Sequence, residues 1–444
     1  MFEKYNLTKP DNLVELFENS VKKYGERQYL GTKNKAGEYE WITYREMGER
    51  VDNLRAGLAS LGIRQGDAVG IIANNSVEWA VGHFAVNGLG AMYVPMYEAE
   101  LPQVWEYIVR DSAVKLLFVS QQRILERVSD FPKRIPTLER IILIHGTGPD
   151  TMAALEKAGA EKPVKSVYPK PEEVAVLVYT SGTTGDPKGV LLMHGNWTSN
   201  HHARAVAYPG FNPDDRSLSL LPWAHCFGLG ELHTFTAIGG SLGFMESTAT
   251  VVQDMAKVRP TFLIAVPRIF NKVYDTIVTR VNEAGGIKKK LFDAGVAAAK
   301  RKRELAARGK SSALTNLTFR VIDRIVFRKI RELFGGRLRG SMTGSAAMNP
   351  EISRFFFDIG IPLYDAYGLS ETTPGITVNC PDAYGIGSVG RPGQGQGRHR
   401  PIRRRAWGEG RRDRRVRAQR HEGLPQQARG DQGRHDRGRR HQDR

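Results

Sequence analysis

The chain has 444 residues, 41% of them hydrophobic, which is enough apolar material for a large core and for more than one lobe. Its two cysteines, Cys226 and Cys380, exclude a disulfide framework and lack a paired metal-ligand spacing, so we expect a reducing compartment. The start of the chain lacks a signal-peptide pattern, and no run reaches the ~18 apolar residues of a membrane span. We therefore expect a cytoplasmic protein, either free or peripheral to the inner face of a membrane.

The net charge of +18 is unevenly distributed along the chain. Residues 393–444 hold 17 arginines, no lysine and 6 acidic residues, which gives +11 over 52 residues and leaves +7 for the preceding 392. A basic balance usually indicates nucleic acid or an anionic membrane as a partner. Here the tail and the body are two different kinds of sequence.

Apolar runs alternate with helical patterns along the body of the chain. Helical spacing at Ser76 to Asn87 and Leu101 to Asp111 separates the first short β-type runs, and this βαβ rhythm predicts a mostly parallel sheet with helices on both faces. The rhythm recurs further on, so we expect an α/β protein with two sheet-bearing lobes. The β-type runs are Ala68 to Ala73, Ala91 to Pro95, Lys115 to Val119, Arg140 to Ile144, Val174 to Tyr179, Thr261 to Val266 and Pro362 to Asp365.

The segment "VYTSGTTGDPKGV", Val178 to Val190, concentrates glycines, hydroxyl side chains and one lysine directly after a buried strand. Glycines let backbone amides approach a ligand, and Lys188 adds a cation, so the segment predicts an anion cradle suited to a polyphosphate at the carboxyl end of a sheet. A Walker A loop is excluded because Pro187 stands where that motif needs glycine. The simpler alternative is an ordinary turn rich in glycine and threonine.

This string resembles the phosphate-binding signature of the AMP-forming adenylating enzymes, a superfamily of acyl-CoA synthetases, luciferases and peptide-synthetase adenylation domains. Two more segments resemble that family in the family's order: "GSAA" at Gly344 to Ala347 and "YDAYGLSETTP" at Tyr364 to Pro374. The resemblance covers residues 1–392. It implies an AMP-binding core with two doubly wound, mostly parallel sheets and a smaller β subdomain.

The resemblance also implies roles for individual residues. Ser370 stands where the family usually has a threonine on the α-phosphate, and Tyr367 offers an aromatic face for adenine. The ATP phosphates would be held by Thr180, Ser181, Gly182, Thr183, Thr184, Gly185, Lys188 and Ser370. The adenine would be lined by Gly344, Ser345, Ala346, Asp365, Ala366, Tyr367 and Gly368.

The implied chemistry brings two anions together, because a carboxylate must attack the α-phosphorus of ATP. Lys188, oriented amides and Mg²⁺ would offset that repulsion. Glu371 is the implied Mg²⁺ ligand, with Thr180 as a second, since Mg²⁺ prefers hard oxygens. A solvated loop carboxylate is the alternative for Glu371. In the family, the thiol of coenzyme A then captures the acyl adenylate.

The segment "LPWAHCFG", Leu221 to Gly228, resembles the family segment whose histidine lies near the substrate carboxylate. We therefore expect His225 to be catalytic and His225, Phe227 and Gly228 to line the acyl pocket, although a histidine among aromatic residues is also typical of a packed core. "AVPRIFNKVYD", Ala265 to Asp275, with the long basic segment after it, is similar to long-chain fatty acyl-CoA synthetases. A long acyl chain is therefore expected.

Two further patterns leave alternatives open. A helix is predicted from Phe319 to Phe334, ended by Gly335 and Gly336, and its apolar face either packs on the core or lies on a membrane surface. That face comprises Phe319, Ile322, Val326, Ile330 and Leu333. The histidines at 194, 201, 202, 225 and 233 lack the tight spacing of a zinc site.

The tail departs from the family pattern. After "GSVGRPG" the pattern requires a Thr-Gly-Asp, a hinge and a C-terminal domain with a catalytic lysine, none of which is found in this sequence. Read one base later, permitted codons for Gln419 to Arg444 allow a string that resembles the family segment before Thr-Gly-Asp. Our hypothesis is a frameshift soon after Arg391, which predicts a disordered tail over 393–444 and severely reduced acyl-CoA synthesis. The alternative is an evolved arm for nucleic acid or an acidic partner.

Three functions remain open from the sequence. The first is the core of a long-chain fatty acid–CoA ligase, with fatty acid, ATP and coenzyme A as substrates. The second is a related ligase that transfers its acyl group to another acceptor, and the third is a non-catalytic module that binds a nucleotide or a fatty acid. No specific nucleic-acid partner is expected, and the sequence carries no indication of the oligomeric state.

Overall fold

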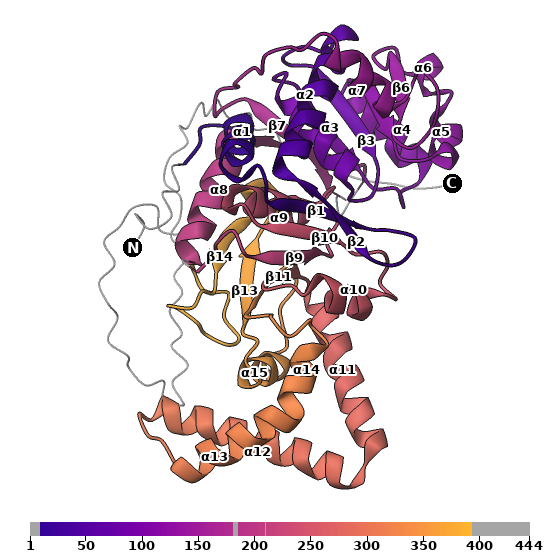
Figure 1. Cartoon of the computed structure of the whole chain (residues 1–444). Helices are drawn as coiled ribbons and strands as arrows, with labels where there is room; N and C mark the ends of the chain where they lie inside the picture. The colour runs from indigo at the N-terminus through magenta and orange to yellow at the C-terminus, as the bar shows by residue number, and fades with distance from the viewer. Residues whose placement is uncertain (1–8, 181–184, 209, 393–444) are drawn as a thin grey trace, which may run out of the picture. The chain divides into compact units, whose positions relative to one another are not determined.

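The structure is a computed structural model that describes residues 9–180, 185–208 and 210–392 (Figure 1). The tail at 393–444, with the frameshift and the arm predicted for it, lies outside the described residues. So do Ser181, Gly182, Thr183 and Thr184 of the phosphate signature.

The first sheet has strand order β6-β5-β3-β4-β7-β8, parallel except for the antiparallel β7–β8 hairpin at one edge. Its central strand β3 is buried at every position, as expected for a parallel strand covered on both faces. The strands are β3 (Ala68–Ile72), β4 (Met92–Met96), β5 (Val114–Val119), β6 (Arg140–Leu143), β7 (Val174–Thr180) and β8 (Lys188–Met193).

Helices cover both faces of this sheet. Val69 and Ile71 of β3 pack in one core cluster with Trp79, whereas Ala68 and Ile72 pack in another with Trp105. Alternate residues of a strand point to opposite faces, so the two clusters lie on opposite sides of the sheet. The helices are α1 (Leu13–Tyr24), α2 (Tyr44–Ser60), α3 (Val77–Asn87), α4 (Pro102–Asp111), α5 (Gln122–Val128), α6 (Phe131–Arg134) and α7 (Met152–Ala160).

The second sheet has strand order β2-β1-β10-β9, and only its β1–β2 pair is antiparallel. Tyr44, the first residue of α2, ties that helix to α9 and to the residue before β10, because its one hydroxyl proton is shared between the carbonyls of Phe235 and Gly240 at 3.0 and 2.8 Å. The elements are β1 (Gln28–Lys33), β2 (Tyr39–Thr43), β9 (Arg216–Ser219), β10 (Ser241–Phe244), α8 (His194–Ala207), α9 (Cys226–Ile238) and α10 (Val251–Val258).

The third sheet has strand order β11-β12-β13-β14-β15, with a parallel half and an antiparallel half that meet at β13. The predicted α/β class with mostly parallel sheets is confirmed, and the antiparallel pairs are β1–β2, β7–β8, β13–β14 and β14–β15. The elements are β11 (Leu263–Ala265), β12 (Ser341–Thr343), β13 (Leu363–Gly368), β14 (Gly375–Val378), β15 (Arg391–Pro392), α15 (Pro350–Asp358) and the 3₁₀ turn η3 (Ser370–Thr372).

A helical insertion separates β11 from β12 and packs on α15. Aromatic rings join the two, with centroid distances of 5.4 Å between Phe270 and Phe356 and 6.0 Å between Phe292 and Phe355. The insertion consists of α11 (Pro267–Ala284), α12 (Gly286–Ala307), α13 (Ala313–Ile322), the π-helical turn η2 (Asp323–Phe327) and α14 (Arg328–Glu332).

The prediction of one regular helix from Phe319 to Phe334 is wrong, because a π-helical turn separates α13 from α14. The π-helical turn at Asp323–Phe327 shifts the register, so that Phe327 is fully buried while Val326 is only partly buried. Ile322 and Ile330 are buried, as expected if this face packs on the core. Gly335 and Gly336 follow the helix with positive φ, as predicted for its end.

Candidate nucleotide and acyl site

The described part of the phosphate signature lies at the open end of the β7–β8 hairpin. Thr180 pairs with Lys188 across the strands, and its hydroxyl donates to the Lys188 carbonyl at 3.5 Å. The Lys188 side chain is exposed, and Gly185 has φ +157°. Thr180 and Lys188 therefore stand at the carboxyl end of a buried strand, which is where the sequence predicts the anion cradle.

The two predicted adenine segments lie on neighbouring strands of the third sheet. Thr343 of β12 pairs with Asp365 of β13, so Gly344 leaves the sheet beside Ala366. A Cβ on Gly344 would lie 3.3 Å from the Ala366 carbonyl oxygen and 3.5 Å from the Phe227 ring. Glycine thus permits a close approach of three segments. Ser345 and Ala346 follow as exposed residues, and Ser345 has a left-handed φ of +69°.

Asp365 and Tyr367 give this edge its chemical character. The Oδ1 atom of Asp365 is buried and has no hydrogen-bond partner within the described ranges, and burial raises the pKa of this carboxyl to about 6. The Tyr367 ring, two residues on, is 50% exposed. An unpartnered acceptor beside a half-exposed aromatic face fits a planar base that carries amino groups.

The turn after β13 is held by its own hydroxyl groups and by a steric limit. The Leu369 amide donates to the Thr372 hydroxyl at 3.0 Å, and that hydroxyl donates to the Pro374 carbonyl at 2.8 Å. A Cβ on Gly368 would lie only 1.5 Å from the same Pro374 oxygen, so only glycine fits. The turn leaves the Glu371 carboxylate exposed, and η3 lies against β8.

The start of α9 lies between these segments. His225 is exposed, and its ring packs edge-on against Tyr97 with centroids 6.0 Å apart; partial burial lowers the pKa of its imidazole. The packed-core alternative for His225 is therefore wrong. Phe227 is 9% exposed, and a Cβ on Gly228 would meet the Pro222 carbonyl oxygen at 2.3 Å.

Residues that the sequence reasoning missed hold this segment in place. The Asn75 side chain, just after β3, accepts from the Trp223 amide and donates to the Leu221 carbonyl, both at 2.8 Å. The Cys226 thiol donates to the Ser370 hydroxyl at 3.4 Å. An Asn-Asn pair after an apolar strand was the only signal in the sequence, and nothing pointed to Cys226.

The three motifs therefore meet around α9. Cys226 contacts the Ser370 hydroxyl, Phe227 approaches Gly344, and η3 packs on the strand that carries Lys188. The exposed side chains at this junction include the Lys188 ammonium, the Glu371 carboxylate, the His225 imidazole and the Tyr367 phenol ring. Such a set can bind a polyphosphate, a divalent cation, a carboxylate and a planar base.

Four histidines form a buried cluster instead of a ligand site. His83, which the sequence reasoning missed, hydrogen-bonds with His233 through their Nε2 atoms at 2.8 Å, and the rings of His201 and His233 are 5.2 Å apart. Burial lowers the pKa of His83 to about 3 and that of His194 to about 4, so these rings are neutral near pH 7. His202 is exposed, as is His225.

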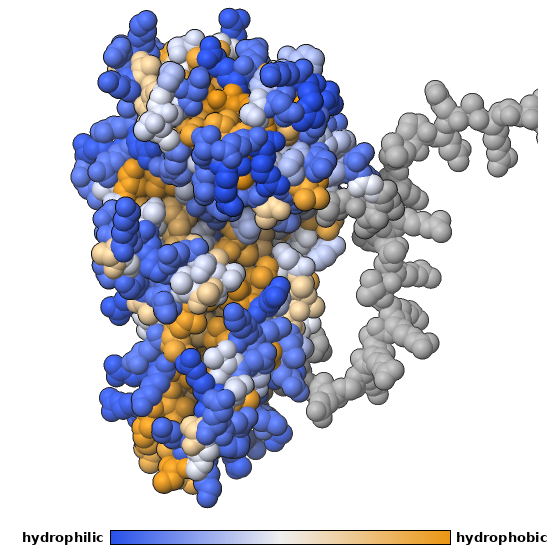
Figure 2. Space-filling view, turned by 90° about the vertical axis from the view of Figure 1, so that its right-hand side faces the viewer, coloured by the Kyte–Doolittle hydropathy of each residue, from blue (hydrophilic) through white to orange (hydrophobic). Residues whose placement is uncertain are grey.

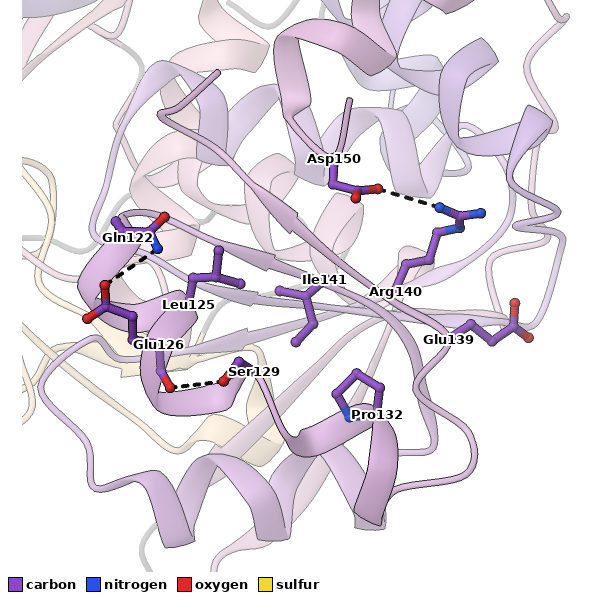
Figure 3. A pocket seen from close by; sticks show the side chains of 9 residues that line it. All are labelled: Gln122, Leu125, Glu126, Ser129, Pro132, Glu139, Arg140, Ile141 and Asp150. Atoms are coloured by element: carbon purple, nitrogen blue, oxygen red, sulfur yellow. Dashed lines mark hydrogen bonds and ion pairs between the residues drawn. The ribbon is translucent and has the colours of Figure 1, made fainter. Parts of the chain in front are cut away.

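A wide cavity of about 860 Å³ lies elsewhere, along the edge strand β6 and α5 (Figure 3). Glu126 and Glu139 line it, and Arg140 pairs with Asp150 across 3.5 Å at its rim. It contains none of the predicted site residues.

The sequence profile described as AMP-binding enzyme matches residues 17–397. The chain belongs to the AMP-binding enzyme family. Similar proteins include fatty acyl-CoA synthetase A of Dictyostelium discoideum, which is 30% identical over 84% of this chain and 57% of that protein. The peroxisomal long chain acyl-CoA synthetase 7 of Arabidopsis thaliana is 31% identical over 86% and 55%. Long-chain-fatty-acid–CoA ligase FadD15 of Mycobacterium tuberculosis is 30% identical over 79% and 59%.

Solved structures show the same fold. A long-chain-fatty-acid-CoA ligase (FadD1) from Archaeoglobus fulgidus matches with a TM-score of 0.66 and 21% identity, over 87% of this chain and 70% of that one. The anthranilate CoA ligase AuaEII in complex with anthranoyl-AMP matches with a TM-score of 0.66 and 20% identity, over 87% and 64%. The chain spans a little more than half the length of the curated relatives it matches. Among the described helices, none has the length and apolar character needed to cross a membrane.

Proposed function

We propose that this chain is the nucleotide-binding and acyl-binding part of a long-chain fatty acid–CoA ligase that activates the acid as an acyl adenylate. The observation that carries the proposal is the junction of the phosphate hairpin, the adenine segments and the start of α9. The long-chain relatives support the substrate class, and the two free thiols suit a reducing compartment.

The proposed roles follow from the exposed groups. Lys188 and the backbone of the hairpin would bind the β- and γ-phosphates of ATP, and Ser370 would contact the α-phosphate. Tyr367 would stack on the adenine, and the free Asp365 oxygen would accept from it. His225 and Phe227 would position the acyl carboxylate beside the α-phosphorus.

The donor set also fits Mg²⁺. The Glu371 carboxylate is exposed on η3, which contacts β8, the strand that begins at Lys188. The Thr180 hydroxyl, on the residue paired with Lys188, would be the second hard oxygen. When bound, Mg²⁺ would neutralise phosphate charge and polarise the phosphoryl oxygens. No protein nucleophile is needed, because the fatty acid carboxylate itself forms the bond to phosphorus and pyrophosphate leaves.

The phosphate assignment is tested with Lys188→Ala. We expect binding of a non-hydrolysable ATP analogue to weaken about tenfold, because a charge-assisted contact is lost, while AMP binding stays close to that of the parent chain. Isothermal titration of both nucleotides measures this, with Lys133→Ala as an exposed lysine outside the site. Equal losses for ATP analogue and AMP would contradict the assignment.

In Glu371→Gln, the enhancement of ATP-analogue binding by Mg²⁺ should disappear.

The acyl assignment is tested with stable acyl-adenylate analogues of graded chain length and with fatty-acid-dependent exchange between ATP and pyrophosphate. Affinity and exchange should both rise with chain length, because each buried methylene adds apolar area. An affinity that does not change with the length of the acyl chain would overturn the proposal of a long-chain substrate. If exchange occurs but the adenylate is not transferred to the thiol of coenzyme A, the ligase with another acceptor gains support.

A further inference from the structure

The positive charge of the described body is concentrated in one part of the helical insertion. Residues 285–334 contain 14 basic and 4 acidic residues, which gives +10 over 50 residues. With +11 at 393–444, this leaves −3 for the remaining 342 residues. The insertion therefore has a charge that the rest of the body does not share.

The insertion also exposes an apolar stripe, which we define as Leu314, Leu317, Val321 and Ile325. Their exposed fractions are 75%, 58%, 49% and 46%. The spacings of three, four and four residues place them on one side of α13 and η2. The core-facing side of the same segment is formed by other residues, because Ile322 and Phe327 are the ones buried in the core. The segment thus has two apolar faces, and only one of them is covered.

Arginines border the stripe at a regular distance. Arg320, Arg324 and Arg328 follow Leu317, Val321 and Ile325 by three residues each, and all three arginines are exposed. Arg328 pairs with Glu332 at 3.2 Å. Arg320 and Arg324 form no ion pair with any described residue. Their charges are therefore available to an external anion.

A smaller cavity of about 310 Å³ adds to this surface between α12 and α13. Lys302, Asn316, Phe319, Arg320 and Asp323 line it, and the Lys302 ammonium lies 4.2 Å from the centroid of the Phe319 ring. The Asp323 carboxylate is already paired with Arg331 at 2.6 Å. With that carboxylate neutralised by Arg331, the two cations and the amide suit a phosphate group. Apolar surface also reaches solvent at the end of the molecule formed by the insertion (Figure 2).

We propose that this surface docks on an anionic lipid bilayer. The apolar stripe enters the boundary between headgroups and acyl chains, and Arg320 and Arg324 bind lipid phosphates. Nucleic acid or an acidic protein would pair with the arginines but would leave the stripe in water, so a bilayer is the occupant that satisfies both features. The proposal concerns binding alone and does not depend on the proposed catalytic function.

The test is co-sedimentation of the full chain with phosphatidylcholine vesicles, with and without phosphatidylglycerol, at low salt. The stripe variant is Leu317→Ser with Val321→Ser, and the charge variant is Arg320→Gln with Arg324→Gln. Each should weaken binding to the anionic vesicles about tenfold, since each surface cation or inserted side chain contributes severalfold. Matched controls are Leu101→Ser, an exposed leucine at 63%, and the exposed pair Arg64→Gln with Lys133→Gln. These controls should change the affinity less than about twofold.

The controls separate this surface from general positive charge, including that of residues 393–444. Equal losses in the control pair and in the arginine pair would overturn the proposal, as would a stripe variant that binds vesicles like the parent chain. A stripe variant that changes only the oligomeric state would show that a second copy covers the stripe. A preference for nucleic acid over vesicles that depends on Arg320 and Arg324 would also overturn it.

A second readout does not depend on affinity or on the stability of a variant. The fluorescence of the tryptophan in Leu317→Trp should be quenched by bromine atoms on the lipid acyl chains, and this quenching should exceed that seen with the tryptophans of the parent chain. Because Leu317 is exposed, the thermal midpoint should stay that of the parent chain. A folded Leu317→Trp variant that binds vesicles without added quenching would show that the stripe stays outside the bilayer.

Discussion

Glu231 is a fully buried acid on α9, behind the proposed acyl segment. The Ser217 hydroxyl donates to its Oε1 at 2.7 Å, whereas its Oε2 has no partner among the described residues. Burial raises the pKa of this carboxyl from 4.5 to about 8. Near pH 7 the folded chain therefore holds a neutral acid here, in a site that would penalise a carboxylate.

This carboxyl makes stability depend on pH with a definite sign. Its folded pKa lies above its unfolded pKa, so its contribution is complete below pH 4.5 and is lost as pH rises to about 8. Glu231→Gln cannot ionise, so between pH 5 and pH 8 its free energy of unfolding should gain about 3 kcal/mol relative to the parent chain. Urea unfolding of both chains at the two pH values measures the gain. If the difference in unfolding free energy between the two chains is the same at both pH values, the pKa of Glu231 is the same in the folded and the unfolded chain.

At the scale of single elements, the π-helical turn is closed by one ion pair. Arg331 donates to both carboxylate oxygens of Asp323 at 2.6 and 2.9 Å and to the Ile359 carbonyl at 2.9 Å. A two-pronged contact between residues eight apart clamps the extra residue of the turn. The arginine also ties this turn to the end of α15.

Arg331→Ala should therefore destabilise the chain more than the loss of an ordinary surface pair. We expect a decrease of about 1–3 kcal/mol in the free energy of unfolding, because Asp323 and the Ile359 carbonyl lose their partner while half-buried. The matched control is Arg328→Ala on the same helix, whose pair with Glu332 is exposed and should contribute about 0.5 kcal/mol or less. Equal effects in urea unfolding would show that the clamp adds nothing.

At the scale of the whole described molecule, α15 links the basic insertion to the sheet that carries the adenine segments. Phe356 is fully buried between Phe270 and Phe334, with centroid distances of 5.4 and 5.9 Å. The half-buried pair of Arg303 and Asp358, 3.4 Å apart, adds a second connection. One aromatic side chain thus joins the two ends of the insertion to the nucleotide sheet.

Phe356→Ala should decrease the free energy of unfolding by about 3–5 kcal/mol, through lost burial and the cavity left behind. Phe357→Ala, at the adjacent position, provides a control because Phe357 is 37% exposed and its removal leaves no enclosed cavity. Urea unfolding followed by circular dichroism measures both. A Phe356→Ala chain as stable as Phe357→Ala would mean that the insertion packs on α15 without depending on this ring.

The sequence by itself determined the α/β class, the strands β3 to β7 of the first sheet and the place of the glycine-rich segment after β7, but not the edge strand β8. Those features depend on local signals: a strand buried on both faces is continuously apolar, and a glycine-rich turn after it needs no distant partner. The motif order was equally visible, because it depends on residue types along the chain.

Tertiary structure alone decided which distant residues share the site and which apolar faces stay exposed. Cys226 and Ser370 are 144 positions apart, and His83 and His233 are 150 positions apart, so no periodicity relates them. The pattern around Phe319 contains two apolar faces, and only packing on α15 and α12 buries one and leaves the other in solvent. Periodicity shows that a face is apolar, but the partner that covers it is a long-range contact, which local sequence does not encode.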